Sequence, residues 1–250
     1  MQQYRPQGFS MLPPVVKNLL IINGILFLTT IVLESTFHID LVKFLGLHYT
    51  LSTDFGVWQL VTYMFMHGGF THILFNMFAL WMFGNTLENV WGPKRFLNYY
   101  LVTGIGAAVV QLFIAWIRIK SIESGMQPSE IEMVIREGAD ILGRGMNYQN
   151  PSMRELNTII NTPTVGASGA VFGILIAFGM MFPNSLIYVY FAIPVKAKYF
   201  VMIYGGIELY MGFSNNPGDN VAHFAHLGGM IFGFFLIMLW KNKGDINSFN

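Results

Sequence analysis

The stretch NTPTVGASGAVFGILIAFGMMF, residues 161–182, decides how this chain is built. Residues 164–182 are almost wholly apolar and long enough to cross a bilayer, which takes about 17–25 mainly apolar residues. Within the stretch, Ser168 stands between Ala167 and Gly169, with Gly166 just before them and Gly173 following. Serine is common in membrane helices as a small packing residue, so another role for Ser168 needs support from the rest of the chain.

The composition is that of a polytopic membrane protein. Of the 250 residues, 54% are hydrophobic and only 11% are charged, and the mean hydropathy is +0.50. A soluble domain carries about 25% charged residues, so this chain lacks the polar surface to dissolve. The net charge of +1, without a basic stripe, argues against a nucleic-acid partner. The absence of cysteine excludes disulfides, a thiolate nucleophile and cysteine metal sites.

Apolar runs predict an all-α bundle of six transmembrane helices, at residues 15–33, 70–87, 96–117, 164–182, 199–213 and 221–240. The first run has no small-residue cleavage site behind it, so we expect a retained span rather than a signal peptide. The predicted organisation is an N-terminal tail (1–14), a six-span membrane domain (15–241) with a long external loop (118–162), and a C-terminal tail (242–250).

The distribution of Lys and Arg predicts the orientation. With six spans both termini share one side, and on that side the ends and loops are basic: Arg5, Lys17, Lys94, Arg95, Lys196, Lys198, Lys241 and Lys243. The other side has Lys43 and a loop, 118–161, whose five basic residues are offset by six acidic ones. Because short cytoplasmic loops carry the excess of Lys and Arg, we expect both termini in the cytoplasm.

Three other stretches are predicted not to span. The aromatic segment VWQLVTYMFMH, residues 57–67, is too short to cross and is expected in the outer interface, where Trp and Tyr are favoured. The apolar stretch before the fifth span, interrupted by Pro194, is expected at the interface as well. In the external loop, Ser129 followed by Glu132 has the spacing of a capping box and predicts a short amphipathic helix.

Several strongly polar residues fall inside the predicted spans, where such residues are functional hypotheses by default. His72 and Asn76 are four residues apart and lie on one helical face, although both could simply hydrogen-bond neighbouring helices. Ser168 begins the fourth span and His226 begins the sixth. If those two helices pack together, the hydroxyl and the imidazole come within hydrogen-bond reach, the arrangement in which His activates Ser as a nucleophile.

Glycine spacing favours that packing. Gly169 and Gly173 follow Ser168, and Gly229 and Gly233 follow His226, each pair forming a small-xxx-small motif that lets two helix backbones approach. The serine is not in the G-x-S-x-G motif of soluble hydrolases. No carboxylate is expected beside His226: Glu208 is predicted far from the outer ends of the helices, and Asp219 is on a loop. A Ser–His dyad therefore fits better than a triad.

Three short motifs together resemble the rhomboid family of intramembrane serine proteases, of the bacterial type: HGGFTHILFNMFALWMFG (67–84), GASGAVFG (166–173) and AHLGGMIFG (225–233). The resemblance implies that a peptide bond in or beside a transmembrane segment of a protein substrate is hydrolysed through an acyl-enzyme, without a cofactor or metal, in a bacterial inner membrane. It implies Ser168 as nucleophile and His226 as general base and acid. His72, Asn76 and the Ser168 amide would form the oxyanion hole, and Gly166 would let the chain pass close to the scissile carbonyl.

The chain departs from the family's pattern at two positions. Trp58 is followed by Gln59 where many members have Arg, which removes a charged anchor but touches no catalytic role. Phe172 stands where relatives often carry a Tyr packed against the catalytic His; it keeps the ring, so packing is expected to survive. Of the two histidines in HFAHLGG, His226 is predicted to be catalytic and His223 to be an interfacial neighbour near water.

Two alternatives stay open at this stage. His67, His72, His223 and His226 could supply imidazoles to a metal or haem, although no cysteine or well-placed acid completes such a site. If His67 does not bind a metal or haem, it is expected to be a structural hydrogen-bonding residue. The second alternative is a catalytically inactive relative that binds membrane clients.

Overall fold

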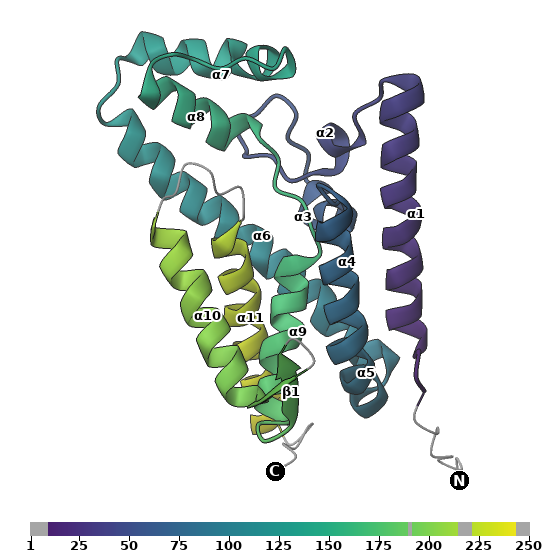
Figure 1. Ribbon diagram of the computed structural model, residues 1–250. Coiled ribbons are helices and arrows are strands. Elements are labelled where there is room, and N and C mark those ends of the chain that lie inside the picture. Colours follow the sequence, from purple (N-terminus) through teal and green to yellow (C-terminus); the bar gives the residue numbers. More distant parts are fainter. Residues whose placement is uncertain (1–9, 190–191, 215–221, 244–250) are drawn as a thin grey trace.

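The computed structural model describes residues 10–189, 192–214 and 222–243 of the chain (Figure 1). Residues 1–9 and 244–250 of the predicted tails lie outside the described residues, as do Asp219 and Val221. The helices of the first half are α1 (Pro14–Phe37), α2 (Leu41–Leu45), α3 (Gln59–Thr62), the 3-10 turn η1 (Tyr63–Phe65), α4 (Phe70–Ala79), the π-helical turn η2 (Leu80–Gly84), α5 (Asn85–Trp91) and α6 (Pro93–Glu123). The second half contains α7 (Pro128–Gly143), α8 (Pro151–Asn161), α9 (Ser168–Met181), β1 (Leu186–Val189), β2 (Ile193–Lys196), α10 (Ala197–Ser214) and α11 (His223–Asn242).

The long helices form a membrane bundle, which confirms the predicted fold class. Helical segments lie where the six spans were predicted, and α1 begins at the same end of the bundle at which α11 ends (Figure 1). In the described part of the chain, α1, α6 and α11 are long and apolar enough to cross a membrane, and α9 is a shorter apolar helix. Large apolar side chains cover the outer surface: Ile25, Met202 and Phe235 are 58%, 67% and 61% exposed. Such a surface suits lipid rather than water. The number of crossings stays a prediction.

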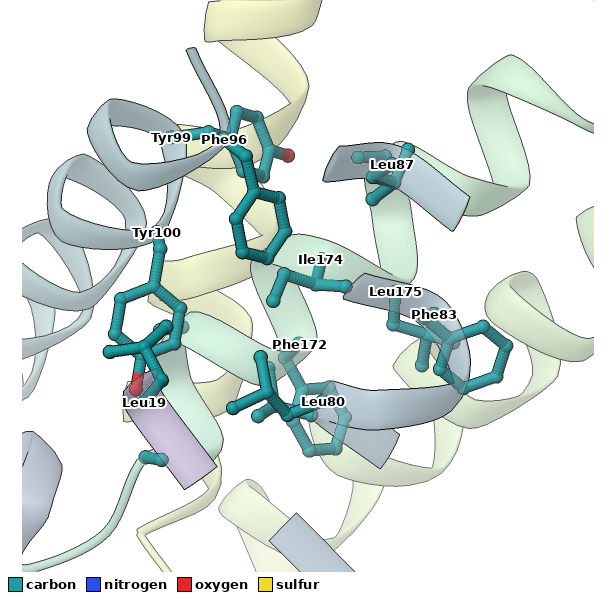
Figure 2. Packing of buried hydrophobic residues seen from close by; sticks show 14 of the residues in the cluster. Leu19, Leu80, Phe83, Leu87, Phe96, Tyr99, Tyr100, Phe172, Ile174 and Leu175 are labelled. Carbon is teal, nitrogen blue, oxygen red and sulfur yellow. The ribbon is translucent and has the colours of Figure 1, made fainter. Parts of the chain in front are cut away.

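Helix α9 is the centre of the bundle. Ten of its fourteen residues are buried, so it is covered all round, as expected of a helix that is apolar on every face. Its main neighbours are α6 and α11. Figure 2 shows Phe172, Ile174 and Leu175 of α9 among aromatic and aliphatic side chains of η2 and α6.

Glycines bring the backbones of α9 and α11 into direct contact. A Cβ added at Gly229 would overlap the carbonyl oxygen of Gly169. One turn further, a Cβ at Gly233 would meet the Tyr99 hydroxyl and lie 3.2 Å from the Gly173 carbonyl oxygen. Thus Gly229 and Gly233 face the backbone of α9, where a side chain would force the two helices apart, whereas a Cβ at Gly169 or Gly173 would meet Ala107 or Thr103 of α6.

Several buried polar groups join helices of the bundle through hydrogen bonds. The Tyr63 and Tyr99 hydroxyls each donate a 2.7 Å hydrogen bond, to the carbonyl oxygens of Gly104 and Gly173. The Glu88 carboxylate on α5 accepts from the backbone N–H groups of Val15 and Val16, at 2.9 and 2.8 Å. Glu88 therefore satisfies two of the N–H groups that the first turn of α1 would otherwise leave without acceptors.

The aromatic segment before α4 is held by hydrogen bonds of an uncharged side chain. The Gln59 amide donates to the carbonyl oxygens of Phe44 and Asp54, at 3.2 and 2.8 Å, and accepts from the His48 N–H at 3.1 Å. The Trp58 indole also donates to Phe44, at 3.0 Å. Gln59 thus ties three points of the segment together without the charge that Arg would bring.

The long loop that was predicted to be external is folded. Helices α7 and α8 pack on each other and on the end of α6 through a second apolar cluster that includes Ile119, Val134 and Leu156. The predicted helix begins two residues earlier than Ser129 indicated: Gln127 is the N-cap and pairs with Glu130 in a capping box. Pro128 in the first helical position explains the shift, because proline is favoured there.

The apolar stretch before α10 forms a hairpin. Strands β1 and β2 are antiparallel, with Leu186 opposite Lys196 and Val189 opposite Ile193. It runs directly into α10, which begins at Ala197, two residues before the predicted start of the fifth span.

The glycine contact gives a direct test of the bundle. We expect Gly229→Ala to lower the thermal unfolding temperature strongly, because its methyl group would overlap backbone atoms of α9 that no rotamer change can move. Gly24→Ala on α1 is the matched control: nothing lies within 4 Å of its Cβ position, and alanine is favoured over glycine in helices by about 0.5–1 kcal/mol. The unfolding temperature of Gly24→Ala in detergent should equal or exceed that of the wild type. Similar unfolding temperatures for both variants would contradict this packing.

Candidate active site

Ser168 and His226 meet at the α9–α11 interface. Ser168 is the first residue of α9, and His226 lies in the first turn of α11. Their side chains are 2.8 Å apart, Oγ to Nε2. The contact between Gly169 and Gly229 lies one residue after the serine and three after the histidine, and it holds the two helices at the distance that this hydrogen bond requires.

Aromatic stacking fixes the plane of the histidine ring. The Phe172 ring is parallel to the His226 imidazole, with 4.2 Å between centroids and an interplanar angle of 7°. The Phe172 ring also stacks on the Tyr204 ring of α10, with 5.1 Å between centroids. His226 is 8% exposed, so the imidazole is held between neighbouring helices rather than free in solvent.

Gly166 shapes the space in front of the serine. Its φ of +127° is a backbone conformation that residues with a side chain rarely adopt. A Cβ at this position would lie 2.7 Å from His72 Nε2 and 3.5 Å from Ser168 Oγ. The His72 ring nitrogen and the serine hydroxyl therefore face one small space that glycine keeps open.

His72 and Asn76 lie on one face of α4, but their hydrogen-bond partners differ. The Gly68 N–H donates to His72 Nδ1 at 3.4 Å, so in the neutral ring the hydrogen is on Nε2, which points toward Gly166. Asn76 is buried and its Nδ2 donates to the His72 carbonyl oxygen at 2.9 Å. That bond uses one of the two hydrogens on Nδ2.

Glu208 lies beside the histidine, which corrects the expectation that no carboxylate would be near. Its Oε2 is 2.8 Å from His226 Nδ1 and 2.6 Å from His223 Nδ1. His223 is 7% exposed, so it is not the water-facing neighbour that the sequence suggested. The physical reason is the position of α10, which starts early after the hairpin and packs beside α9 and α11. Glu208 lies within a predicted span, where an acidic residue needs a polar partner, and this could have predicted the contact from the sequence.

The same three side chains are the group that could hold a metal ion. Ligand atoms of Glu208, His223 and His226 all lie within 4.8 Å of one another. Two imidazoles and a carboxylate suit zinc or another divalent transition metal. His67 and His72 are not part of this group; their rings contact each other edge to face at 5.1 Å. The four histidines of the metal or haem alternative are thus divided between two places.

Comparison with known protein families assigns the chain. The Rhomboid domain model matches residues 54–118 and 139–243. The chain belongs to the rhomboid family. The matched residues run from α3 to α11 without 119–138, which hold the end of α6 and the first part of α7, and they contain Ser168, His226 and Glu208.

Individual relatives agree with the rhomboid assignment at low identity. A putative rhomboid protease of Bacillus subtilis, YdcA, is 26% identical over 190 residues, 75% of this chain and 69% of its own length. The rhomboid protease AarA of Providencia stuartii is 28% identical over 189 residues, 74% and 56% of the two chains. The mitochondrial RHOMBOID-like protein 12 of Arabidopsis thaliana is 28% identical over 170 residues, 68% and 42%. The match thus spans about half the length of several rhomboid relatives.

His67, in the loop just before α4 of the rhomboid bundle, gives a test by pH. Burial, and to a smaller extent the neighbouring His72, lowers the pKa of His67 to about 4. In the unfolded chain His67 is therefore protonated below about pH 6.5, whereas in the folded chain it stays neutral until about pH 4. Stability should fall across this window as pH falls, by up to about 1.4 kcal/mol per pH unit.

We expect the unfolding temperature in detergent to drop between pH 7 and pH 5, and to drop less in His67→Leu. His38→Asn is the matched control, because His38 is exposed and its left-handed backbone conformation suits asparagine. Burial also lowers the pKa of His48, so part of the pH dependence should remain in every variant. An unchanged pH dependence in His67→Leu would contradict the assignment.

Proposed function

We propose that this rhomboid is an intramembrane serine endopeptidase that cleaves peptide bonds in or next to transmembrane segments of membrane proteins. The single observation that carries the proposal is the 2.8 Å contact between Ser168 Oγ and His226 Nε2 at a buried helix interface. A serine and a histidine at this distance form the activated pair of acyl-transfer enzymes. The relatives that bear the name rhomboid protease support the same activity.

In the proposed mechanism, Ser168 Oγ attacks the scissile carbonyl carbon while His226 Nε2 takes the hydroxyl proton. The tetrahedral oxyanion is held by His72 Nε2, Asn76 Nδ2 and the Ser168 backbone N–H. That N–H is in the first turn of α9, where backbone N–H groups have no acceptor within the helix and the helix dipole favours negative charge. His226 then gives its proton to the leaving amine, and the acyl group stays on Ser168.

Water completes the proposed cycle. His226 takes a proton from a water molecule, which attacks the acyl carbonyl carbon. The bond from that carbon to Ser168 Oγ then breaks, the product leaves as a carboxylic acid, and His226 returns the proton to Oγ. The open space beside Gly166 is where the substrate backbone would lie, since a side chain there would fill it. Each step uses groups of this chain, so the proposal requires no cofactor.

The substrate arrives from the lipid in this account, because the helices present apolar side chains outward. We propose that both termini are cytoplasmic, on the side where the short loops are basic. The membrane would be the inner membrane of a bacterium, as the six-span organisation implied. Named relatives include mitochondrial proteins, which share the membrane character of the family.

A second function is favoured by one observation, the Glu208, His223 and His226 group with the chemistry of a metal site. A metal there would contact His226 on the side away from Ser168 and would make the chain a binder rather than a protease. An inactive client-binding relative is the remaining alternative, and the Ser168–His226 contact disfavours it.

Cleavage of a reporter transmembrane segment by the purified protein tests the proposal. We expect wild type to cleave in the presence of EDTA, and Ser168→Ala and His226→Ala each to lose at least about a thousand-fold in rate. Ser35→Ala and His38→Asn, both at exposed positions near the end of α1, should cleave like wild type. Cleavage that disappears with EDTA, or that persists in Ser168→Ala, would exclude the serine mechanism.

A further inference from the structure

Glu208 forms a buried hydrogen-bond cluster with two histidines. It lies on α10, and both histidines lie on α11, three residues apart and therefore on one face of the helix. A single oxygen, Oε2, contacts Nδ1 of His223 at 2.6 Å and Nδ1 of His226 at 2.8 Å. The side chains of Glu208, His223 and His226 are only 6%, 7% and 10% exposed.

The shared oxygen determines where the protons are. An ionised carboxylate can only accept hydrogen bonds, so both Nδ1 atoms must carry a hydrogen. A protonated carboxyl group would donate to one ring and accept from the other, whereas the ionised carboxylate accepts from both. Two donors to one carboxylate oxygen favour the ionised form. With the hydrogen on Nδ1, the neutral His226 ring has an unprotonated Nε2, which can accept the proton of Ser168 Oγ.

We propose that Glu208 is the positioning residue of His226 and that His223 holds Glu208 in place, so that the site works as Ser168–His226–Glu208 with a second histidine behind the carboxylate. This inference rests on the proposed peptidase function and adds a residue to it.

Packing alone does not orient the imidazole. The parallel Phe172 ring fixes the plane of His226, but a ring can turn within that plane or flip without losing the stack. The hydrogen bond from Nδ1 to Glu208 removes that freedom and turns the Nε2 edge toward Ser168. In serine hydrolases a buried carboxylate at this position fixes the tautomer in the same way and stabilises the imidazolium that forms during attack.

His223 restrains the carboxylate from the other side. Glu has three rotatable side-chain bonds and would lose its alignment if only one partner held it. The contact with His223 fixes the position of Oε2 and supplies a second donor to a buried charge, which is costly to leave unpaired. Among the described residues, the other ionisable groups around the pair are Tyr204, one turn before Glu208 on α10, and His72, across the site on α4.

The test compares Glu208→Gln with wild type in the reporter-cleavage assay. Glutamine keeps the shape but removes the charge and can present an N–H to Nδ1. We expect kcat to fall about 10²–10⁴-fold with KM changed less than about three-fold.

Glu88→Gln is the matched control. Glu88 is also a buried carboxylate with two hydrogen-bond donors, but it caps α1 and has no contact with the site. Its loss should lower the unfolding temperature and leave kcat close to that of wild type. His223→Leu should lower kcat by less than about ten-fold, since the carboxylate keeps its contact with His226.

Two results would overturn the proposal while the peptidase function stands. One is a Glu208→Gln variant whose kcat matches that of wild type while Ser168→Ala is inactive. The other is one metal ion per protein that copurifies with wild type and inhibits cleavage until EDTA removes it, because the cluster would then be a metal site. A wild type that never cleaves refutes the proposed function itself.

Nitrogen NMR of ¹⁵N-histidine-labelled wild type keeps the proposal testable if Glu208→Gln does not fold. The chain has six histidines, and His223→Leu and His226→Phe would assign the two signals of interest. We expect both rings to be protonated at Nδ1 at neutral pH. A neutral His226 protonated at Nε2 would contradict the proposal.

Discussion

The backbone contact between α9 and α11 at Gly169 and Gly229 is the constraint on which the rest of the structure depends. A side chain at Gly229 would separate two helices that carry Ser168 and His226 in their first turns, and a side chain at Gly169 would collide with Ala107 of α6. The hydrogen bond between these side chains exists because the helices touch. It follows that the apolar, glycine-containing interface between α9 and α11 determines the geometry of the polar site. Small residues at helix interfaces serve packing in membranes generally, and here they also position reactive groups.

The second constraint is that polar groups inside the bundle need partners, since the surrounding lipid offers none. The Glu88 carboxylate accepts hydrogen bonds from two backbone N–H groups of α1, and the Tyr99 hydroxyl donates one to a carbonyl oxygen of α9. The Glu208 carboxylate is hydrogen-bonded to two imidazoles. These bonds join helices that are distant in sequence, so each also fixes one element relative to another. The site is an instance of the same rule, with Ser168 and His226 satisfying each other.

Much of the fold could be predicted from the sequence because apolar length and glycine spacing are local signals. The pairing of Ser168 with His226 followed from two small-xxx-small motifs and needed no long-range knowledge. The depth of Glu208 did not follow, because it depends on where α10 begins after the β1–β2 hairpin and on which neighbour it packs against. The cap of α7 was misplaced by two residues because Ser129 is a stronger local signal than Gln127.

The central claim is that Ser168 is a nucleophile made reactive by His226. The most direct measurement is mass-spectrometric mapping of wild type and His226→Phe after treatment with a fluorophosphonate, which phosphonylates activated serines. The account predicts one labelled peptide containing Ser168 in wild type and a large loss of that label in His226→Phe. Absence of label at Ser168 in folded wild type, or equal labelling in the two proteins, would contradict it.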